Sequence, residues 1–301
     1  MEFKSDKVSG ANELVDKALE ILKFQLKQIT DPNEDIKKPI KDLVREIINS
    51  RPSMAPIINA MGFILHDLEI IDKNKLLERI KNFSVDRTAR FKALDTNFTD
   101  FLSIHCKPHC KIMLISYSST IVTLLLKNRN YNLEIYILES RPLLEGRKTA
   151  EILSQYFKTH LIVDTAMGSF IDEIDLVLIG IDSILYDGSI INKIGTYLLA
   201  LLASTKNIEI YAVCDSFKYN LKSHYNLRVL ISEKPIKEVY NKVIRNKLLE
   251  IHNFYFDVTP PKYISGIISD LGVLSISEFL VKVKKILPIE WFKYLIINKE
   301  I

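Results

Sequence analysis

The first hundred residues have apolar side chains at helical spacing. Between residues 12 and 27, leucine, valine and alanine recur every three or four positions, as on the buried face of a helix. The same period returns over residues 38–49, 56–71, 76–83 and 84–105. Asp31-Pro32, Arg51-Pro52 and Pro108 separate or end these segments, because proline interrupts a helix. The pattern predicts a helical N-terminal domain over residues 1–107.

The pattern changes after residue 107. Short apolar runs occupy residues 111–115, 134–138, 160–163, 175–181 and 209–213, and helical segments such as 120–127, 148–157 and a buried helix over 194–203 lie between them. Apolar runs without strict alternation are typical of parallel strands that are covered on both faces. Right-handed crossovers then give a doubly wound sheet. The chain is therefore predicted to be α/β, with a Rossmann-like parallel-sheet C-terminal domain over residues 108–301.

The residues that follow each strand are the best candidates for a ligand site, because ligands of such sheets bind beyond the carboxyl ends of the strands. Five of the nine glycines fall within fifty residues there: Gly146, Gly168, Gly180, Gly188 and Gly195. Each one alone is most simply a turn residue. Together they indicate a close approach of the backbone to a ligand.

Polar residues accompany these glycines. Arg141 follows the run at 134–138, where a guanidinium suits phosphate or carboxylate; the alternative is a surface pair with Glu139 or Glu145. Asp182 follows the run at 175–181.

Basic and amide side chains offer further anion contacts. Asn192 and Lys193 precede an apolar helix, and a helix N-terminus is a natural phosphate site. Asn192 is equally well explained as an N-cap. Arg51 lies at a break between two helices, as a ligand contact or an exposed turn residue. Gly10, just before the first helix, is a cap or a second anion contact.

Charge and composition exclude several classes. The net charge of +4 is mild and the charges are interspersed, so we expect no direct nucleic-acid contact. No apolar run has the length of a membrane span, and the N-terminus does not resemble a signal peptide. Three cysteines imply no disulfide framework. We expect a cytoplasmic protein without a cofactor.

Two other groups of residues could contribute to a site. Residues 105–110 (HCKPHC) contain four metal-ligand types, but a zinc site usually draws on two separated pairs, so a loop before the strand is expected and no metal. Tyr117 and Tyr186 are expected to border the pocket, by stacking on a base or simply by packing.

Longer segments resemble a known family. They are SRP at 50–52, ESRPLLEG at 139–146, INKIGT at 191–196, FDVTPP at 256–261 and ISDLGV at 268–273. They resemble signatures of the translation initiation factor 2B alpha/beta/delta family, which includes methylthioribose-1-phosphate isomerase and archaeal ribose-1,5-bisphosphate isomerase. The resemblance covers essentially the whole chain. It implies a helical domain, a Rossmann-like domain, and a homodimer or higher homo-oligomer formed through the C-terminal domain.

The chain departs from the isomerases where their chemistry takes place. In them a cysteine follows the first sheet strand and an aspartate a later one, an acid/base pair on opposite sides of the sugar carbons. Asp182 matches the aspartate, but Ser116 takes the place of the cysteine, and a thiol has a pKa of only about 8.5. Ile115 replaces the preceding histidine. Glu145 replaces a glutamine, and Ser9 an arginine.

The resemblance implies a phosphorylated sugar or nucleotide as ligand. The residues expected to bind it are Gly10, Arg51, Arg141, Glu145, Gly146, Asn192 and Lys193. Asp270 stands where the isomerases usually carry glutamate and resembles the alpha subunit. We interpret the chain as a non-catalytic regulatory subunit, with initiation factor 2 or sister 2B-type subunits as partners. The alternatives are a divergent aldose–ketose isomerase, with Asp182 as base and water, Ser116 or Cys214 as the second group, and a dimeric scaffold with a vestigial pocket.

Overall fold

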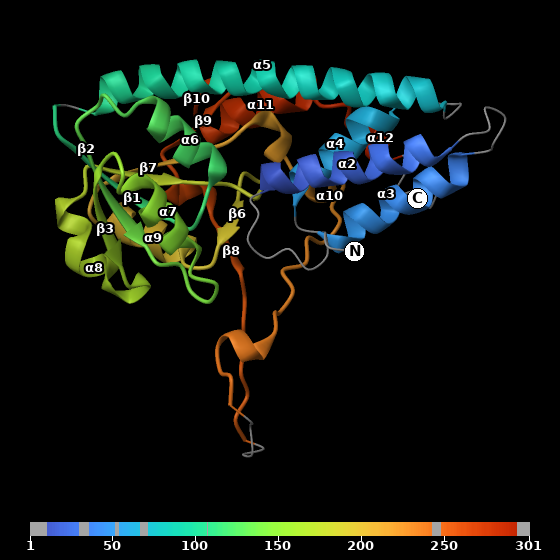
Figure 1. Ribbon diagram of the computed structural model, residues 1–301. Helices are drawn as coiled ribbons and strands as arrows, with labels where there is room; N and C mark the ends of the chain where they lie inside the picture. Colours follow the sequence, from blue (N-terminus) through green and yellow to red (C-terminus); the bar gives the residue numbers. More distant parts are fainter. Residues whose placement is uncertain are drawn as a thin grey trace.

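Helices form the N-terminal part of the chain, as the periodicity predicts. The computed structural model describes residues 11–29, 36–51, 54–66, 72–106, 108–242 and 248–293. The helices before the first strand are α2 (Ala11–Gln28), α3 (Lys37–Ser50), α4 (Ala55–Leu65) and α5 (Lys73–His105) (Figure 1). The segments 76–83 and 84–105 are one continuous helix of 33 residues, because neither glycine nor proline interrupts them. The Asp72 side chain caps its start by accepting from the Lys75 amide at 2.8 Å.

The C-terminal part is built on a seven-stranded sheet in the order β10-β9-β7-β4-β1-β2-β3. The strands are β1 (Cys110–Ile115), β2 (Leu133–Leu138), β3 (Lys158–Ile162), β4 (Leu176–Ile179), β7 (Glu209–Val213), β9 (Gly266–Ser269) and β10 (Gly272–Leu274). All pair in parallel except β10, which is antiparallel to β9. From β1 the chain moves outward to β2 and β3 and then returns to β4 on the other side of β1. The α/β prediction is confirmed, and the direction of winding reverses between β1 and β4.

Helices cover both faces of the sheet. Helix α5, with α6 (Ser119–Lys127) and α7 (Glu145–Leu153), packs on one face around Ile112, Leu114 and Ile135. On the other face α8 (Met167–Phe170) and α9 (Thr196–Thr205) contribute Met167, Leu199 and Ala203 to the core that contains Met113 and Val177. Two 3-10 turns, η1 (Asp164–Ala166) and η2 (Ile171–Glu173), flank α8. Apolar runs buried on both sides are the reason why these strands lack alternation.

A second, three-stranded sheet changes one part of the prediction. It pairs β5 (Ser183–Ile184), β6 (Ile190–Lys193) and β8 (Phe256–Thr259) antiparallel. Asn192 and Lys193 therefore end a strand and do not open a helix, so the predictions of a helix N-terminus and an N-cap were wrong. Gly195, with φ of 99°, precedes α9 instead. The cause is pairing with residues more than sixty positions later, which no local pattern reveals.

The last hundred residues connect the two parts of the chain. After β7 come η3 (Ser216–Lys218) and α10 (Leu221–His224); after β8 come η5 (Pro261–Tyr263), α11 (Ile276–Ile286) and α12 (Glu290–Phe292). Between α10 and β8 a long arm, with η4 (Ile236–Glu238), projects from the body (Figure 1). The amide of Lys234 and the carbonyl of Asn253 join its two legs at 2.8 Å.

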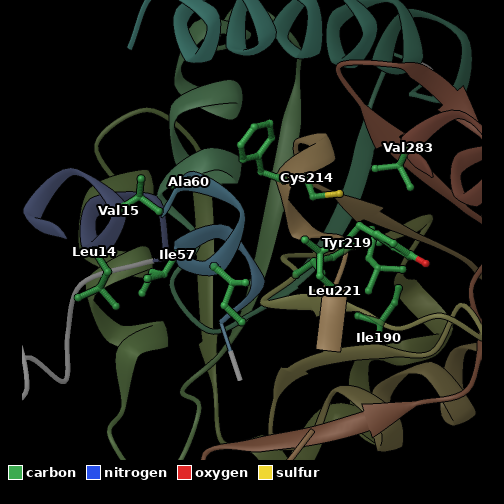
Figure 2. Close-up of a cluster of buried hydrophobic side chains, with 14 of the residues drawn as sticks. Leu14, Val15, Ile57, Ala60, Ile190, Cys214, Tyr219, Leu221 and Val283 are labelled. Carbon is green, nitrogen blue, oxygen red and sulfur yellow. The ribbon is translucent and has the colours of Figure 1, made fainter. Parts of the chain in front are cut away.

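One hydrophobic cluster extends from the N-terminal helices to the sheet. Figure 2 shows Leu14 and Val15 of α2 and Ile57 and Ala60 of α4 in the same cluster as Cys214 and Val283. The division at residues 107 and 108 remains a prediction. In the described ranges, no helix is both long enough and apolar enough to cross a membrane.

Two expectations about single segments were wrong. Helix α9 is not buried all round, because the Leu198 side chain is 62% exposed. Cys106 and Cys110 are joined in a disulfide between the end of α5 and the start of β1, although the cysteine count suggested none.

Candidate functional site

The candidate site is a small pocket at the point where the winding of the sheet reverses. Its volume is about 60 Å³. Its lining residues are Asn12, Ile115 to Thr120, Gly180 to Asp182, Asn192 and Lys218. Ser116 follows β1 and Asp182 follows β4, so the two neighbouring strand ends contribute the two residues to one pocket. This is the place where doubly wound sheets bind ligands.

The loop after β1 has a fixed conformation. Ser116 has φ of 70°, a left-handed backbone that non-glycine residues seldom adopt. Its amide donates to the Ser140 hydroxyl at 2.7 Å, and its carbonyl accepts from the Thr149 hydroxyl at 2.9 Å. The N-terminal helices reach the same loop, since the Asn12 amide donates to the Thr120 hydroxyl at 3.1 Å. The hydroxyl that replaces the family thiol is therefore carried on a rigid turn.

Asp182 is the acidic group of the pocket. Its amide donates to the Ile191 carbonyl at 2.9 Å, which joins the end of β4 to the second sheet. Burial raises the pKa of the carboxyl above its ordinary value, and Glu145 adds to the rise while Lys218 and Lys193 oppose it. Within the described ranges, no residue hydrogen-bonds to the carboxylate.

Lys193 is paired with the unusual Glu145. The Lys193 ammonium lies 2.8 Å from the Glu145 carboxylate, and only 3% of the lysine side chain is exposed. Gly146 makes the arrangement possible, because a Cβ there would collide with the Leu138 carbonyl. The N-terminus of α7 can thus approach the end of β2. The negative charge that the sequence placed near the site neutralises one of the cations predicted to bind the ligand.

The two predicted arginines are not among the residues that line the pocket. Arg141 is exposed; its amide donates to Asp164 at 2.7 Å and its guanidinium to the Glu238 carbonyl at 3.5 Å. Arg51 is half-buried near the base of the arm, where its charge lowers the pKa of Lys234 after the larger effect of burial. Gly10 lies outside the described residues.

The N-terminus of α9 is not free to bind phosphate. The Asp257 carboxylate accepts hydrogen bonds from the Gly195 and Tyr197 amides at 2.8 and 3.1 Å. Burial raises the pKa of Asp257 to about 6, although these two amides oppose the rise. Asn192 remains at the pocket, and its amide donates to Thr196 at 3.1 Å. An anion of the protein itself occupies the position proposed for the ligand's phosphate.

Lys218 is a pocket residue that the sequence reasoning missed. It belongs to η3, directly after β7, and only 7% of its surface is exposed. The rule that pointed to Ser116 and Asp182 applies here too, because Lys218 also follows the carboxyl end of a strand. Lys218 is five residues beyond Val213, the last residue of β7, so the sequence did not show that it follows this strand.

Thiols are absent from the described lining of this pocket. Cys214 lies in the hydrophobic cluster of Figure 2, and burial raises its pKa well above the ordinary value, so the thiol stays protonated near neutral pH. Cys106 and Cys110 are at the opposite edge of the sheet. The described residues contain no cluster of three or more ligand-type side chains that could hold a metal ion.

Of the two predicted bordering tyrosines, Tyr117 lines the pocket and Tyr186 does not. The Tyr117 hydroxyl donates to Glu13 at 3.2 Å, and Lys148 lies 3.7 Å from its ring centroid. Tyr186 is 51% exposed and packs near Lys284.

A larger cavity adjoins the pocket. Its volume is about 480 Å³. It shares Asn12, Ser119 and Thr120 with the pocket and is lined further by residues of α2 and α5 such as Asp16, Ser84, Arg87 and Thr88. Its walls carry charges of both signs, because Arg87 and Asp16 form an ion pair there.

Comparison with known proteins agrees with this architecture. The model of the Initiation factor 2 subunit family matches residues 7–276. The chain belongs to this family. It is 28% identical to the ribose 1,5-bisphosphate isomerase of Methanocaldococcus jannaschii over 91% of this chain and 89% of that protein. The crystal structure of translation initiation factor eIF-2B from Pyrococcus horikoshii is also 28% identical, with a TM-score of 0.78 over 91% of this chain and 94% of that one.

A more distant structure shares the fold. A subunit of the tetrameric eIF2B-β2δ2 complex of C. thermophilum is 14% identical, with a TM-score of 0.65 over 94% of this chain and 91% of that one. The family therefore contains both enzymes and translation factors, as the sequence resemblance implied.

Proposed function

We propose that this chain binds a phosphorylated sugar or nucleotide in the pocket around Asp182 and acts, without catalysis, as a regulatory subunit towards translation initiation factor 2. The observation that carries the proposal is the lining of the pocket, which has a carboxyl, an ammonium group and hydroxyls but no thiol among the described residues.

Proton transfer between adjacent sugar carbons needs a matched acid and base. Asp182 can serve as the base. Among the described residues, no base contacts the Ser116 hydroxyl, and the hydrogen bonds of Ser116 are made by its backbone amide and carbonyl. The hydroxyl therefore cannot readily replace a thiol. Cys214, which directly follows the carboxyl end of β7, is part of the hydrophobic core. These facts support binding without isomerisation.

Ligand stabilisation tests the binding. Ribose 5-phosphate, AMP and ribose 1,5-bisphosphate are added to the purified protein and the melting temperature is measured. A ligand present at a hundred times its Kd stabilises the native state by about 2.7 kcal/mol, so at least one should raise the melting temperature by several degrees. Ribose and inorganic phosphate are the controls. If no phosphorylated compound raises it, the scaffold reading is favoured.

The second candidate is an aldose–ketose isomerase. The identity with the Methanocaldococcus jannaschii enzyme favours it, and so does the raised pKa of Asp182, which suits a general base. Conversion of ribose 1,5-bisphosphate to ribulose 1,5-bisphosphate by the wild-type protein, lost in Asp182→Asn, would establish this candidate and refute the non-catalytic proposal.

The same proposal includes an assembly. We expect a homodimer or higher homo-oligomer through the C-terminal domain, located in the cytoplasm, with initiation factor 2 or sister 2B-type subunits as partners. The exposed apolar face of α9 supports it: Tyr197, Leu198 and Leu201 are 37%, 62% and 37% exposed. An apolar patch of this kind is typical of a protein interface.

A further inference from the structure

We infer that Asp164, which is not among the residues that line the pocket, is a positioning residue for the loop that carries Ser116. Its carboxylate holds the turn after β2, and through that turn it holds the loop after β1. The inference rests on the proposed function, because it assumes that a phosphorylated sugar or nucleotide binds against this loop.

The Asp164 carboxylate accepts hydrogen bonds from two consecutive backbone amides. Asp164 is the first residue of η1 and lies two positions beyond the end of β3. Its two oxygens accept from the amides of Ser140 and Arg141, each at 2.7 Å. Hydrogen bonds from amides to a carboxylate are stronger than those between neutral groups. The carboxylate therefore fixes the turn after β2 at two adjacent points.

Ser140 passes this constraint to the loop after β1. The residue is fully buried. Its hydroxyl accepts from the Ser116 amide at 2.7 Å and donates to the Leu138 carbonyl at 2.9 Å. A hydroxyl has a single proton, so the bond to Leu138 determines how the oxygen faces the Ser116 amide. The Ser116 amide is thus held by a side chain whose own backbone is held by Asp164.

These contacts follow the order of the strands. β3, β2 and β1 are neighbours in the sheet and pair in parallel. Asp164 lies two residues beyond β3, Ser140 two residues beyond β2, and Ser116 one residue beyond β1. A chain of hydrogen bonds therefore runs along the carboxyl edge of the sheet, from the outer strand β3 to the pocket where the winding reverses.

Two residues of this chain have a backbone that must be held in place. Ser116 and Ser140 have φ of 70° and 68°. This left-handed conformation is unfavourable for a residue with a Cβ, and it persists where surrounding contacts impose it. Loss of the Asp164 carboxylate should let both residues relax. Residues 116–120, which line the pocket, would then move with them.

The test compares two aspartate-to-asparagine variants. Asp164→Asn keeps the shape of the side chain but has an oxygen for only one of the two amides. Asp175→Asn is the matched control, because the Asp175 carboxylate accepts the Lys111 amide at 2.8 Å at the amino end of β1. Hydrogen exchange of residues 116–120 without ligand is measured by mass spectrometry. Kd for ribose 5-phosphate is measured by calorimetry, and the melting temperature is measured in parallel.

Asp164→Asn should speed exchange of residues 116–120 and weaken binding, each about tenfold, as expected for one lost hydrogen bond to a charged group. The Thr149 hydroxyl still holds the Ser116 carbonyl, so the loop is loosened and not released. Asp175→Asn should change both quantities by less than about twofold. The two variants should lower the melting temperature to a similar extent. A carboxylate with a merely structural role would lower the melting temperature without changing exchange of the loop or Kd.

Ser140→Ala shows whether the effect passes through the Ser140 hydroxyl. When this hydroxyl is absent, Asp164→Asn should have little further effect on exchange or on Kd, so the two substitutions should be non-additive. Additive effects contradict the inference. So does an Asp164→Asn variant that fails to fold, or one whose loop exchange and Kd equal those of the wild type.

The exchange measurement needs no ligand, so the inference and the proposed function can fail separately. Faster exchange of residues 116–120 in Asp164→Asn, with no phosphate binding by the wild type, would remove the proposed function and leave Asp164 as the residue that holds the loop. Binding by the wild type that Asp164→Asn retains in full would overturn the inference and leave the proposed function intact.

Discussion

Glu145 neutralises Lys193, one of the cations predicted to bind the ligand. It lies in the first turn of α7, where the helix dipole favours a carboxylate, and it pairs with the buried Lys193. A glutamine, which the family has at this position, would leave the ammonium group uncompensated. We therefore predict that the glutamate found here lowers the affinity for anions and raises stability.

Glu145→Gln should move these two properties in opposite directions. Affinity for ribose 5-phosphate should increase about tenfold, and the free energy of unfolding should fall by about 2 kcal/mol, because one partner of a buried pair is lost. Calorimetry and urea denaturation measure the two effects. Glu139→Gln, which removes a pair with the exposed Arg147, should change neither by much. Weaker binding in Glu145→Gln would mean that Lys193 does not contact the ligand.

Asp257 should make stability depend on pH. Burial raises its pKa from 3.8 to about 6, so the unfolded chain releases this proton first as the pH rises. The contribution of this carboxyl to stability is therefore greatest below pH 4, falls between about pH 4 and 6, and is constant above. The full difference corresponds to about 3 kcal/mol, an upper bound for a side chain that is partly exposed.

Asp257→Asn removes this contribution. Its free energy of unfolding should decline between pH 4.5 and 7.5 by about 2 kcal/mol less than that of the wild type, as measured by urea denaturation. Asp172→Asn, at an exposed carboxylate paired with Lys206, should follow the wild-type profile. Equal slopes for all three proteins would show that Asp257 is not the group responsible.

The residues of the pocket could be predicted only where they directly follow a strand that the sequence itself reveals. Ser116 and Asp182 each follow an apolar strand directly, so the strand-end rule placed them together. Lys218 also follows a strand, but with a short turn between. Arg51 and Arg141 were expected to contact the ligand, but neither lines the pocket. They lie near Lys234 and Glu238 of the arm, whose sequence has no regular apolar period. The hydrogen bonds from the N-terminus of α9 to Asp257 could not be predicted, because Asp257 is distant in sequence from α9.

At the scale of elements, α4 connects the N-terminal helices to the site and to the C-terminus. Asn59 of α4 holds η3, and Gly62 of α4 faces the ring of Trp291 in α12. The helix therefore needs glycine for close packing, although glycine in a helix ordinarily costs stability.

Gly62→Ala should destabilise the protein by about 1–3 kcal/mol, because the added Cβ would collide with the Trp291 ring. Gly168→Ala in α8 is the matched control: no atom lies within 4 Å of an added Cβ there, so this substitution should be neutral or stabilising by up to about 1 kcal/mol. Thermal denaturation of the two variants gives the answer, and a stable Gly62→Ala would show that α12 packs differently.

Elements were predictable in proportion to their periodicity and burial. The strand at 209–213 has the predicted bounds, and α2 differs from its prediction by one residue at each end. The second sheet was missed because β5 and β6 are short and their partner β8 is far away in the chain. The two helices predicted over residues 76–83 and 84–105 are the single helix α5. No glycine or proline lies between them, so nothing in the sequence ends the first helix.

At the scale of the whole molecule, the proposed homodimer depends on the exposed apolar face of α9. Leu198→Glu should convert the proposed dimer to monomer in analytical ultracentrifugation, because it places a charge in an apolar contact. Leu161→Glu, at a 50% exposed leucine on the edge strand β3, should leave the mass unchanged. A wild-type protein that sediments as a monomer would refute an interface on α9.

The cavity of about 480 Å³ beside the pocket has a consequence for chemical probes. A sugar phosphate that enters the pocket near Ser119 and Thr120 would have this cavity next to it, which is lined in part by Ser84 and Thr88 of α5. Substituents added to the sugar could extend there without disturbing the charged groups of the pocket. Because the cavity is formed partly by α2 and α5, such a compound would contact the N-terminal helices as well as the loop that follows β1.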